Sequence, residues 1–304
     1  MFAQSITPEV LSQSVIAVPP LARDTHGNVA IEPNRAIVRH LEAGGVTSIL
    51  YGGNANFYHI RLSEYASTLE MLTQIAGQDS WIIPSVGPAF GLMMDQAEVL
   101  KDFDFPTAMI LPQKEITTPD GIATATRRFA EALGKPVVLY LKHDQILPPK
   151  LIRQLQDDQL LAAIKYAVVR DNPAEDLYLQ SLVQELDRSI IVSGIGEQPA
   201  IVHLRDFGVR GFTSGCVCIA PALSMKMLQA IQANDFETAE HIRQTFQELE
   251  DLRNGINPIR VLHEAVRLAG IADTGSLSPM LSGISADDSI LVKAAAQKLL
   301  LFAE

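Results

Sequence analysis

The sequence has little of several residue types that would mark a specialised class of protein. Among its 304 residues there are two cysteines and one tryptophan, and aromatic residues make up 6% of the chain. The cysteines, Cys216 and Cys218, are too close together for an ordinary disulfide. No histidine or second cysteine pair stands at zinc-site spacing, so both are interpreted as small buried packing residues. No metal is expected.

Basic residues and long apolar runs are also scarce. Lysine and arginine together number 24 against 35 aspartates and glutamates, which gives a net charge of -11. Without a basic stripe, nucleic acid and anionic membrane surfaces are not expected partners. No run approaches the roughly 18 apolar residues that span a bilayer. The first five residues lack the charged and apolar regions of a secretory signal, so a cytoplasmic location is expected.

The chain does contain a regular alternation of short apolar runs and longer amphipathic segments, the pattern of βα units with a parallel sheet. Eight runs are predicted as strands: Ser14–Val18, Thr47–Tyr51, Trp81–Val86, Thr107–Leu111, Pro136–Leu141, Ala162–Tyr166, Ser189–Ser193 and Gly211–Thr213. Helices are predicted between them at Glu32–Ala43, Leu62–Ile75, Met94–Leu100, Thr118–Leu133, Lys150–Gln156, Ala174–Leu186 and Gln198–Phe207. Eight strands close a (β/α)₈ TIM barrel.

After the eighth strand the pattern changes at Pro221, because strands no longer alternate with helices. Helical stretches follow at Ala222–Ala233, Asp235–Asn254, Pro258–Gly270 and Ser289–Phe302. More helices than the barrel needs imply a C-terminal helical appendage packed on the barrel. We therefore predict an α/β chain with a catalytic barrel over residues 1–221 and a helical extension over residues 222–304.

Lys165 is the most informative residue, because it lies inside an apolar run from Leu160 to Val169. A lone ammonium in a buried strand is costly unless it is paired or loses its proton. A lysine that becomes a neutral amine can attack a carbonyl and form a Schiff base. The alternative is a strand-end lysine whose stem is buried while its ammonium reaches water. The segment alone leaves both interpretations open.

Barrel enzymes carry their catalytic groups at the C-terminal ends of the strands, which narrows the search to a few residues. Tyr140 ends the fifth predicted strand, next to the sixth strand that carries Lys165. Ser193-Gly194 ends the seventh strand, and Thr213 ends the eighth. On its own, a tyrosine at a strand end is as readily a packing residue as a functional one.

This order of elements, with Tyr140, Lys165 and Ser193-Gly194, resembles the dihydrodipicolinate synthase / N-acetylneuraminate lyase family of class I aldolases. The resemblance runs from about Ser14 to the C-terminus, and the segments Asn257–Val261 and Leu277–Leu281 add to it. It implies that Lys165 forms an imine with the ketone carbon of pyruvate or another 2-keto acid, and that Tyr140 relays protons. It also implies that no cofactor is used and that the chain forms a homo-oligomer, a tetramer or a dimer.

The sequence departs from the family pattern in the loops around the expected site. Where family members carry Gly-Thr-Thr-Gly-Glu after strand two, this chain has Gly52-Gly53-Asn54-Ala55-Asn56. Gly53 and Asn54 form an altered candidate nest for the substrate carboxylate, or else a plain turn. Pro112-Gln113-Lys114 replaces the second relay tyrosine of the synthases, and Lys142–Gln145 lacks their arginine. Lys114 is kept as a candidate substrate contact.

Two further candidates lie after strand seven, in Gly194-Ile195-Gly196-Glu197. The glycines resemble a phosphate loop but lack an accompanying lysine, so a tight turn before a helix is favoured. Gly194 and Glu197 are kept as candidate substrate contacts, with Glu197 as an acid/base group or a partner for a substrate hydroxyl.

These observations predict a class I lyase that acts on pyruvate or a related 2-keto acid through Lys165, and not dihydrodipicolinate synthase proper. One alternative is a 2-keto-3-deoxy sugar acid dehydratase, which uses the same lysine but eliminates water. The other is a keto-acid-binding protein without catalysis, suggested by the missing relay tyrosine and the rebuilt carboxylate loop. The residues do not identify the aldehyde or sugar-acid partner.

Overall fold

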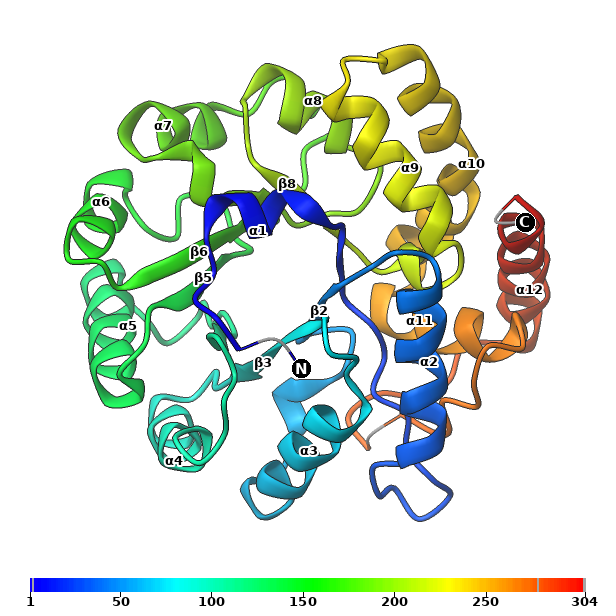
Figure 1. Ribbon diagram of the computed structural model, residues 1–304, viewed down its shortest axis with the longest axis horizontal. Coiled ribbons are helices and arrows are strands. Elements are labelled where there is room, and N and C mark those ends of the chain that lie inside the picture. Colours follow the sequence, from blue (N-terminus) through cyan, green and yellow to red (C-terminus); the bar gives the residue numbers. More distant parts are fainter. Residues whose placement is uncertain (2, 278, 303–304) are drawn as a thin grey trace.

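The computed structural model describes residues 1, 3–277 and 279–302. Eight parallel strands form a closed barrel in which each strand pairs with the next and β8 pairs with β1 (Figure 1). The strands are β1 (Ile16–Ala17), β2 (Ser48–Tyr51), β3 (Trp81–Val86), β4 (Met109–Ile110), β5 (Val137–Leu141), β6 (Leu161–Tyr166), β7 (Ile191–Ser193) and β8 (Gly211–Ser214). The predicted TIM barrel is confirmed, and every predicted strand is present.

A helix follows every strand and together these helices surround the barrel (Figure 1). They are α2 (Ile31–Ala43), α3 (Leu62–Ile75), α4 (Phe90–Leu100), α5 (Pro119–Leu133), α6 (Pro149–Asp157), α7 (Leu177–Glu185), α8 (Ala200–Asp206) and α9 (Pro221–Gln232). Helix α9 contacts both α8 and α2, so it takes the eighth place in the ring. The predicted boundary at residue 221 therefore leaves this eighth ring helix in the segment that we predicted to be the extension.

Three more helices lie outside the ring: α10 (Phe236–Gly255), α11 (Pro258–Leu268) and α12 (Ala286–Leu301). Helix α10 packs on α9, α11 and α12, on the right-hand side of Figure 1. The predicted C-terminal helical appendage is thereby confirmed. Ser278, in the Leu277–Leu281 segment, and residues 303–304 of the predicted extension lie outside the described residues. None of the described helices is long and apolar enough to cross a bilayer.

A short α-helix before the barrel was not predicted. Helix α1 (Pro8–Gln13) precedes β1, and its first turn is capped by the Thr7 hydroxyl, which accepts a hydrogen bond from the Val10 N–H. Thr7 before Pro8 is a helix-start signal that was available in the sequence. The buried Leu11 lies against the start of β8, where a Cβ on Gly211 would come 2.6 Å from the Leu11 carbonyl oxygen. Helix α1 therefore packs on the N-terminal end of the barrel.

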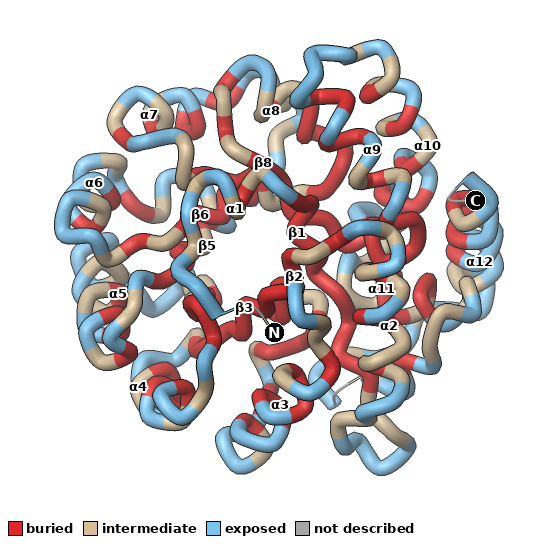
Figure 2. The backbone as a smooth tube through the Cα atoms, in the orientation of Figure 1, coloured by how far each residue is buried: buried red, intermediate tan, exposed pale blue. Residues whose placement is uncertain are grey.

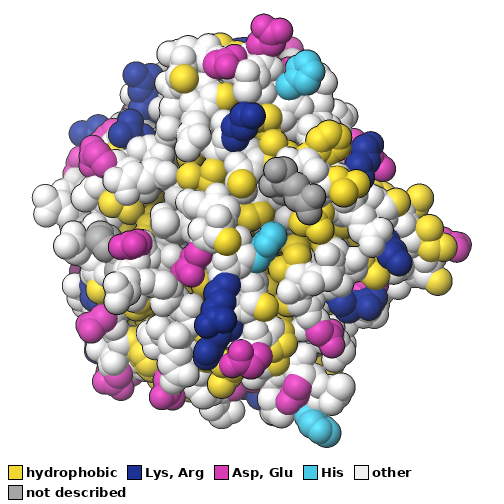
Figure 3. Space-filling model, turned by 45° about the vertical axis from the view of Figure 1, so that its right-hand side comes forward, with side chains coloured by type: hydrophobic (Ala, Val, Ile, Leu, Met, Phe, Trp, Pro, Cys, Tyr) yellow, Lys and Arg dark blue, Asp and Glu magenta, His cyan; other side chains and the backbone are white. Residues whose placement is uncertain are grey.

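The core occupies the barrel and the interface between the strands and the helix ring. Figure 2 shows the strands buried, while exposed residues lie mainly on the outer surfaces of the helices. On the face shown in Figure 3, acidic and basic side chains are interspersed and do not form a stripe. Because all strands are parallel, the loops that follow them meet at one end of the barrel, which is where the candidate residues lie.

Candidate active site

Lys165 occupies a buried position on β6 with no acidic partner. The side chain is 5% exposed, and among the described residues no carboxylate lies within 4.0 Å of its amine. Burial, and to a smaller extent the nearby cations Lys142 and Arg253, lowers the pKa of Lys165 from 10.5 to about 7. Roughly half of the molecules therefore carry a neutral amine at pH 7. The sequence alone left the interpretation of Lys165 open, and this burial favours the reactive amine over an ammonium that reaches water.

Tyr140 is the direct cross-strand neighbour of Lys165 in the β5–β6 register. The Lys165 Nζ lies 4.5 Å from the centroid of the Tyr140 ring. Burial, and to a smaller extent the neighbouring Tyr58, raises the pKa of Tyr140 above its ordinary value of 10.0. The phenol therefore holds its proton at neutral pH and can donate it to a group bound at the lysine.

Two further residues of this site were not among the predicted ones. Lys142 follows Tyr140 by two positions, which places both on the same side of the chain, and its Nζ lies 5.9 Å from the centroid of the Tyr58 ring. The side chain of Lys142 is exposed as a whole, yet burial of the ammonium lowers its pKa. Burial raises the pKa of Tyr58 to about 12. The short helix η1 (Phe57–His59) that carries Tyr58 has no periodic pattern that would have revealed it.

The loop after β2 is held in place from two directions. The Asn54 side-chain amide donates a hydrogen bond of 2.8 Å to the Val18 carbonyl oxygen at the end of β1. The Asn54 carbonyl oxygen accepts one of 2.9 Å from His263 Nε2 on α11. Burial lowers the pKa of His263 to about 4, so the ring is neutral and donates this single proton. The Asn54 amide is thus occupied by the framework, whereas a Cβ on Gly53 would meet only Tyr58, at 3.6 Å.

Gly194 packs directly against the Lys165 side chain. Its N–H donates a hydrogen bond of 2.6 Å to the Tyr166 carbonyl oxygen. A Cβ at this position would come 2.7 Å from the Ala167 Cβ and 3.0 Å from the Lys165 Cγ. Glycine is therefore required for space, because any larger residue would displace the stem of the lysine.

The other candidates lie farther from the amine or are bound elsewhere. Glu197 is fully buried, and its two carboxylate oxygens accept hydrogen bonds from Ser214, at 2.7 Å, and Ser224, at 2.6 Å. Its predicted role at the substrate finds no support in this arrangement. Lys114 is exposed in the loop after β4, and it is not among the cations that shift the pKa of Lys165. Thr213 is buried on β8, where its carbonyl oxygen accepts the Gly196 N–H at 3.0 Å.

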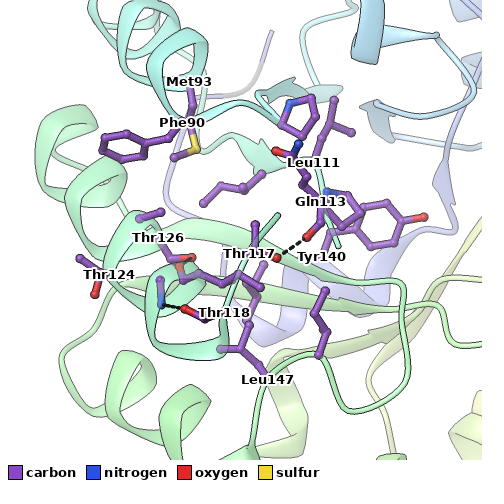
Figure 4. Close-up of a pocket in the computed structure, with 18 of the residues that line it drawn as sticks. Phe90, Met93, Leu111, Gln113, Thr117, Thr118, Thr124, Thr126, Tyr140 and Leu147 are labelled. Carbon is purple, nitrogen blue, oxygen red and sulfur yellow. Dashed lines mark hydrogen bonds between the residues drawn. The ribbon is translucent and has the colours of Figure 1, made fainter. Parts of the chain in front are cut away.

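A cavity of about 670 Å³ opens beside the site, between α4 and α5 and the ends of β4 and β5. Phe90, Met93, Ile116 and Leu147 line it, together with Gln113 and Tyr140. Figure 4 shows the Tyr140 hydroxyl directed away from Phe90 and Met93. Lys165 is not among the lining residues, so the cavity adjoins the lysine site without containing it.

The chemistry available at this site is that of an amine and a phenol. Lys165 can supply a neutral nucleophile, and Tyr140 can supply a proton next to it. Among the described residues, no three histidine, cysteine or acidic side chains lie together in a way that could hold a metal ion. Fold and site together define a (β/α)₈ barrel centred on a buried lysine.

Comparison with known proteins agrees with this description. Residues 12–298 match the dihydrodipicolinate synthetase family, and the chain belongs to that family, whose members are Schiff-base-forming aldolases and lyases. The chain is 26% identical to a 4-hydroxy-tetrahydrodipicolinate synthase of Methanosarcina barkeri, over 82% of this chain and 84% of that protein. It is 22% identical to a probable 5-dehydro-4-deoxyglucarate dehydratase of Cereibacter sphaeroides, over 93% and 95% of the two chains.

The fold is shared with solved structures of the same family. The crystal structure of dihydrodipicolinate synthase from Bacillus clausii has a TM-score of 0.84 to this protein, at 22% identity. The match covers 95% of this chain and 98% of that one. At this sequence identity the structural similarity establishes the barrel and its appendage. The low sequence identities place the chain among the divergent members of the family.

Proposed function

We propose that this protein is a lyase that captures pyruvate or a related 2-keto acid as an imine on Lys165. The observation that carries the proposal is the state of the Lys165 amine, which is buried, lies over the ring of Tyr140 and has no acidic partner in the part of the chain that the structure describes. Its pKa of about 7 provides the nucleophile at neutral pH. Membership of a family of Schiff-base-forming lyases supports the same chemistry.

In the proposed cleavage of a 4-hydroxy-2-keto acid, the neutral Nζ of Lys165 adds to the ketone carbon C2, and the ketone oxygen leaves as water. The resulting iminium attracts the electron pair of the C3–C4 bond when that bond breaks. The C4 hydroxyl loses its proton as the aldehyde forms, and the remaining enamine takes up a proton at C3. Hydrolysis then returns pyruvate and the free amine. Tyr140, beside the amine, carries the protons that these steps exchange.

The remaining predicted residues are assigned by where they lie. Gly53 and Asn54 in the loop after β2, with Thr213 at the end of β8, are proposed to border the bound keto acid. Gly194 is proposed to border it from β7, since it already contacts the Lys165 stem. The exposed position of Lys114 leaves it a role only at the rim of the site.

Reduction with borohydride tests the proposal directly. The protein is incubated with pyruvate and with a panel of other 2-keto acids, reduced, digested and analysed by mass spectrometry. We expect a mass increase on Lys165 with at least one keto acid, and none in Lys165→Met. A folded wild-type protein that gives no adduct with any member of the panel would overturn the proposal. Keto-acid binding without an adduct or turnover would instead identify a binding protein.

A dehydratase is the second candidate, favoured by the relative that matches 93% of this chain and is named a probable 5-dehydro-4-deoxyglucarate dehydratase. On the same imine, dehydration removes a proton from C3 and hydroxide from C4, so that water is lost and the carbon skeleton is kept. Product analysis separates the two reactions. Cleavage releases pyruvate and an aldehyde, whereas dehydration yields one product 18 mass units lighter than the substrate.

We also propose that the chain forms a homo-oligomer, as expected for the family. Two large apolar side chains, Phe90 at 41% exposure and Ile116 at 80%, border the cavity beside α4 and α5. Exposed apolar residues next to a hollow are suited to contact with a second copy. Sedimentation velocity should show a species at least twice the mass of 33.1 kDa, and a purely monomeric sample would contradict this expectation.

A further inference from the structure

Arg253 is a buried cation that the proposed reaction does not yet use. It lies in the last turn of α10, in the C-terminal appendage, and is 9% exposed. Its Nε donates to the Pro258 carbonyl oxygen at 3.4 Å, and its Nη1 donates to the Cys216 sulfur at 3.8 Å. Among the described residues, Nη2 makes no hydrogen bond and no carboxylate lies within 4.0 Å of the guanidinium. A buried guanidinium with such weak partners is costly on its own.

The nearest acidic residues are bound to other groups. Both oxygens of Glu250 accept backbone N–H groups, those of Glu197 at 3.2 Å and Gln198 at 2.9 Å. Burial, together with the charge of Glu197, raises the pKa of Glu250 well above its ordinary value. The Glu197 carboxylate is bound by two serine hydroxyls. Among the described residues, Arg253 therefore makes no ion-pair contact with an acidic side chain, although the charges of Cys216, Glu250 and Glu197 nearby raise its pKa.

Arg253 reaches the end of the barrel that carries the lysine. A Cβ on Gly215, the residue after β8, would come 2.6 Å from Arg253 Nη2 and 2.9 Å from the Asn54 side-chain nitrogen. The φ angle of Gly215 is -90°, which any residue can adopt, so glycine is needed here only for space. The guanidinium thus lies beside the loop after β2, close enough to Lys165 to contribute to the lowering of its pKa.

We propose that Arg253 is a substrate-binding residue that holds the carboxylate of the keto acid captured at Lys165. The inference rests on the proposed function. It places a positive charge beside the altered loop after β2, which has no cationic residue of its own. A carboxylate at Nη2 would give the guanidinium the acceptor that it lacks in the free protein. The substrate class follows: the ligand must carry an anionic group next to the carbonyl, and a neutral ketone or ester is captured poorly.

The test compares capture of pyruvate with capture of methyl pyruvate, which has the same ketone but no negative charge. The concentration of each compound that gives half-maximal borohydride trapping is measured in wild type and in Arg253→Met. Wild type should prefer pyruvate, and Arg253→Met should reduce this preference by about 10- to 100-fold, the range expected for loss of a charge-assisted hydrogen bond. The ratio of the two half-maximal concentrations is compared between wild type and variant. The difference in intrinsic reactivity between the two compounds is the same in both proteins and therefore cancels.

Three further variants separate binding from folding. Arg267→Met removes an exposed arginine of α11 that pairs with Glu264, and it should leave the preference unchanged. Arg253→Lys keeps the charge but not the two-pronged geometry, so an intermediate preference is expected. Gly215→Ala displaces the guanidinium without deleting it and should weaken the preference in the same direction. Thermal melts identify any variant that has lost its fold.

The outcomes distinguish this inference from the function on which it rests. If wild type forms no adduct with any keto acid, the proposed lyase function fails. If wild type forms the adduct but a folded Arg253→Met keeps the full preference for pyruvate, the lyase function stands and the role of Arg253 is refuted. A lost preference in Arg253→Met, with Arg267→Met unchanged, supports it.

Discussion

Two polar clusters lie at the same end of the barrel, and they differ in how their charges are compensated. The lysine cluster consists of Lys165, Tyr140, Tyr58 and Lys142, and the glutamate cluster consists of Glu197, Glu250, Ser214 and Ser224. In the glutamate cluster every carboxylate oxygen accepts a hydrogen bond from a serine hydroxyl or a backbone N–H. In the lysine cluster the central amine has no acidic partner among the described residues.

This difference suggests a structural role for the glutamate cluster and a functional role for the lysine cluster. Buried polar groups that are fully satisfied stabilise one arrangement of the chain, here the loop after β7 between β8, α9 and α10. A buried amine left unpaired destabilises the fold, and such groups with shifted pKa values are typical of functional sites. Removing a member of each cluster should therefore change stability in opposite directions.

The largest effect is expected for Lys165→Met. The variant should form no borohydride adduct, because the nucleophile is gone. It should also be more stable at pH 7, by roughly 4 kcal/mol, since the folded chain no longer has to hold an amine whose pKa falls from 10.5 to about 7. Urea unfolding measures the stability. Lys150→Met, at an exposed position of α6, is the matched control and should change it by less than about 0.5 kcal/mol. A destabilised Lys165→Met would show that the lysine belongs to the framework.

Tyr140→Phe should reduce turnover by about 100-fold or more while leaving the fold intact, because the ring is kept and only the proton donor is lost. Adduct formation with pyruvate should fall much less, since the Lys165 amine remains. The two rates are measured separately, by steady-state product release and by single-turnover trapping. Equal losses in both would place the phenol in imine formation alone, and an unchanged turnover would remove Tyr140 from the mechanism.

Glu197→Ala should destabilise the protein by about 2–4 kcal/mol, because the hydroxyls of Ser214 and Ser224 lose their buried acceptor. Trapping by the folded fraction should stay within about twofold of wild type if the glutamate cluster is framework only. Chemical denaturation and trapping at low temperature give the two values. A tenfold loss of trapping without a loss of stability would reverse the comparison and restore Glu197 as a substrate contact.

The pH dependence should follow Lys165. Adduct formation requires the neutral amine, so its rate should rise about tenfold per pH unit below pH 7 and level off above about pH 8. The stability of the folded chain should change with pH in the same direction as the rate of adduct formation. Above pH 7 the unfolded chain still binds a proton that the folded chain has released, so this lysine makes the free energy of unfolding rise with pH up to about 10.5. Lys165→Met should lack that rise, and an unchanged slope would refute the lowered pKa.

The barrel and its central pair were predictable because they depend on local patterns. Apolar runs of strand length, separated by amphipathic segments, predicted all eight strands, and Tyr140 and Lys165 are indeed paired in register on β5 and β6. Even the missed helix α1 had a start signal at Thr7 and Pro8. These features are encoded within about ten residues of chain, where periodicity and capping act.

The residues that surround the lysine could not be predicted in this way. Arg253 and His263 come from helices that follow the barrel in sequence, yet they contact the ends of β8 and the loop after β2. Glu197 stands on the expected loop, but its side chain is bound by Ser214 and Ser224. Nothing local indicates which way a loop side chain points, because that direction depends on partners distant in the chain.

The barrel, the strand that carries Lys165 and the tyrosine next to it could all be placed from the amino-acid pattern, since hydrophobic periodicity sets which residues enter the core and which strands adjoin. It took the folded structure to establish that the amine has no acidic partner among the described residues, that Glu197 is bound within the framework and that Arg253 approaches the site through the space left by Gly215. Burial and charge compensation arise from long-range packing, and these two quantities set the reactivity of the lysine.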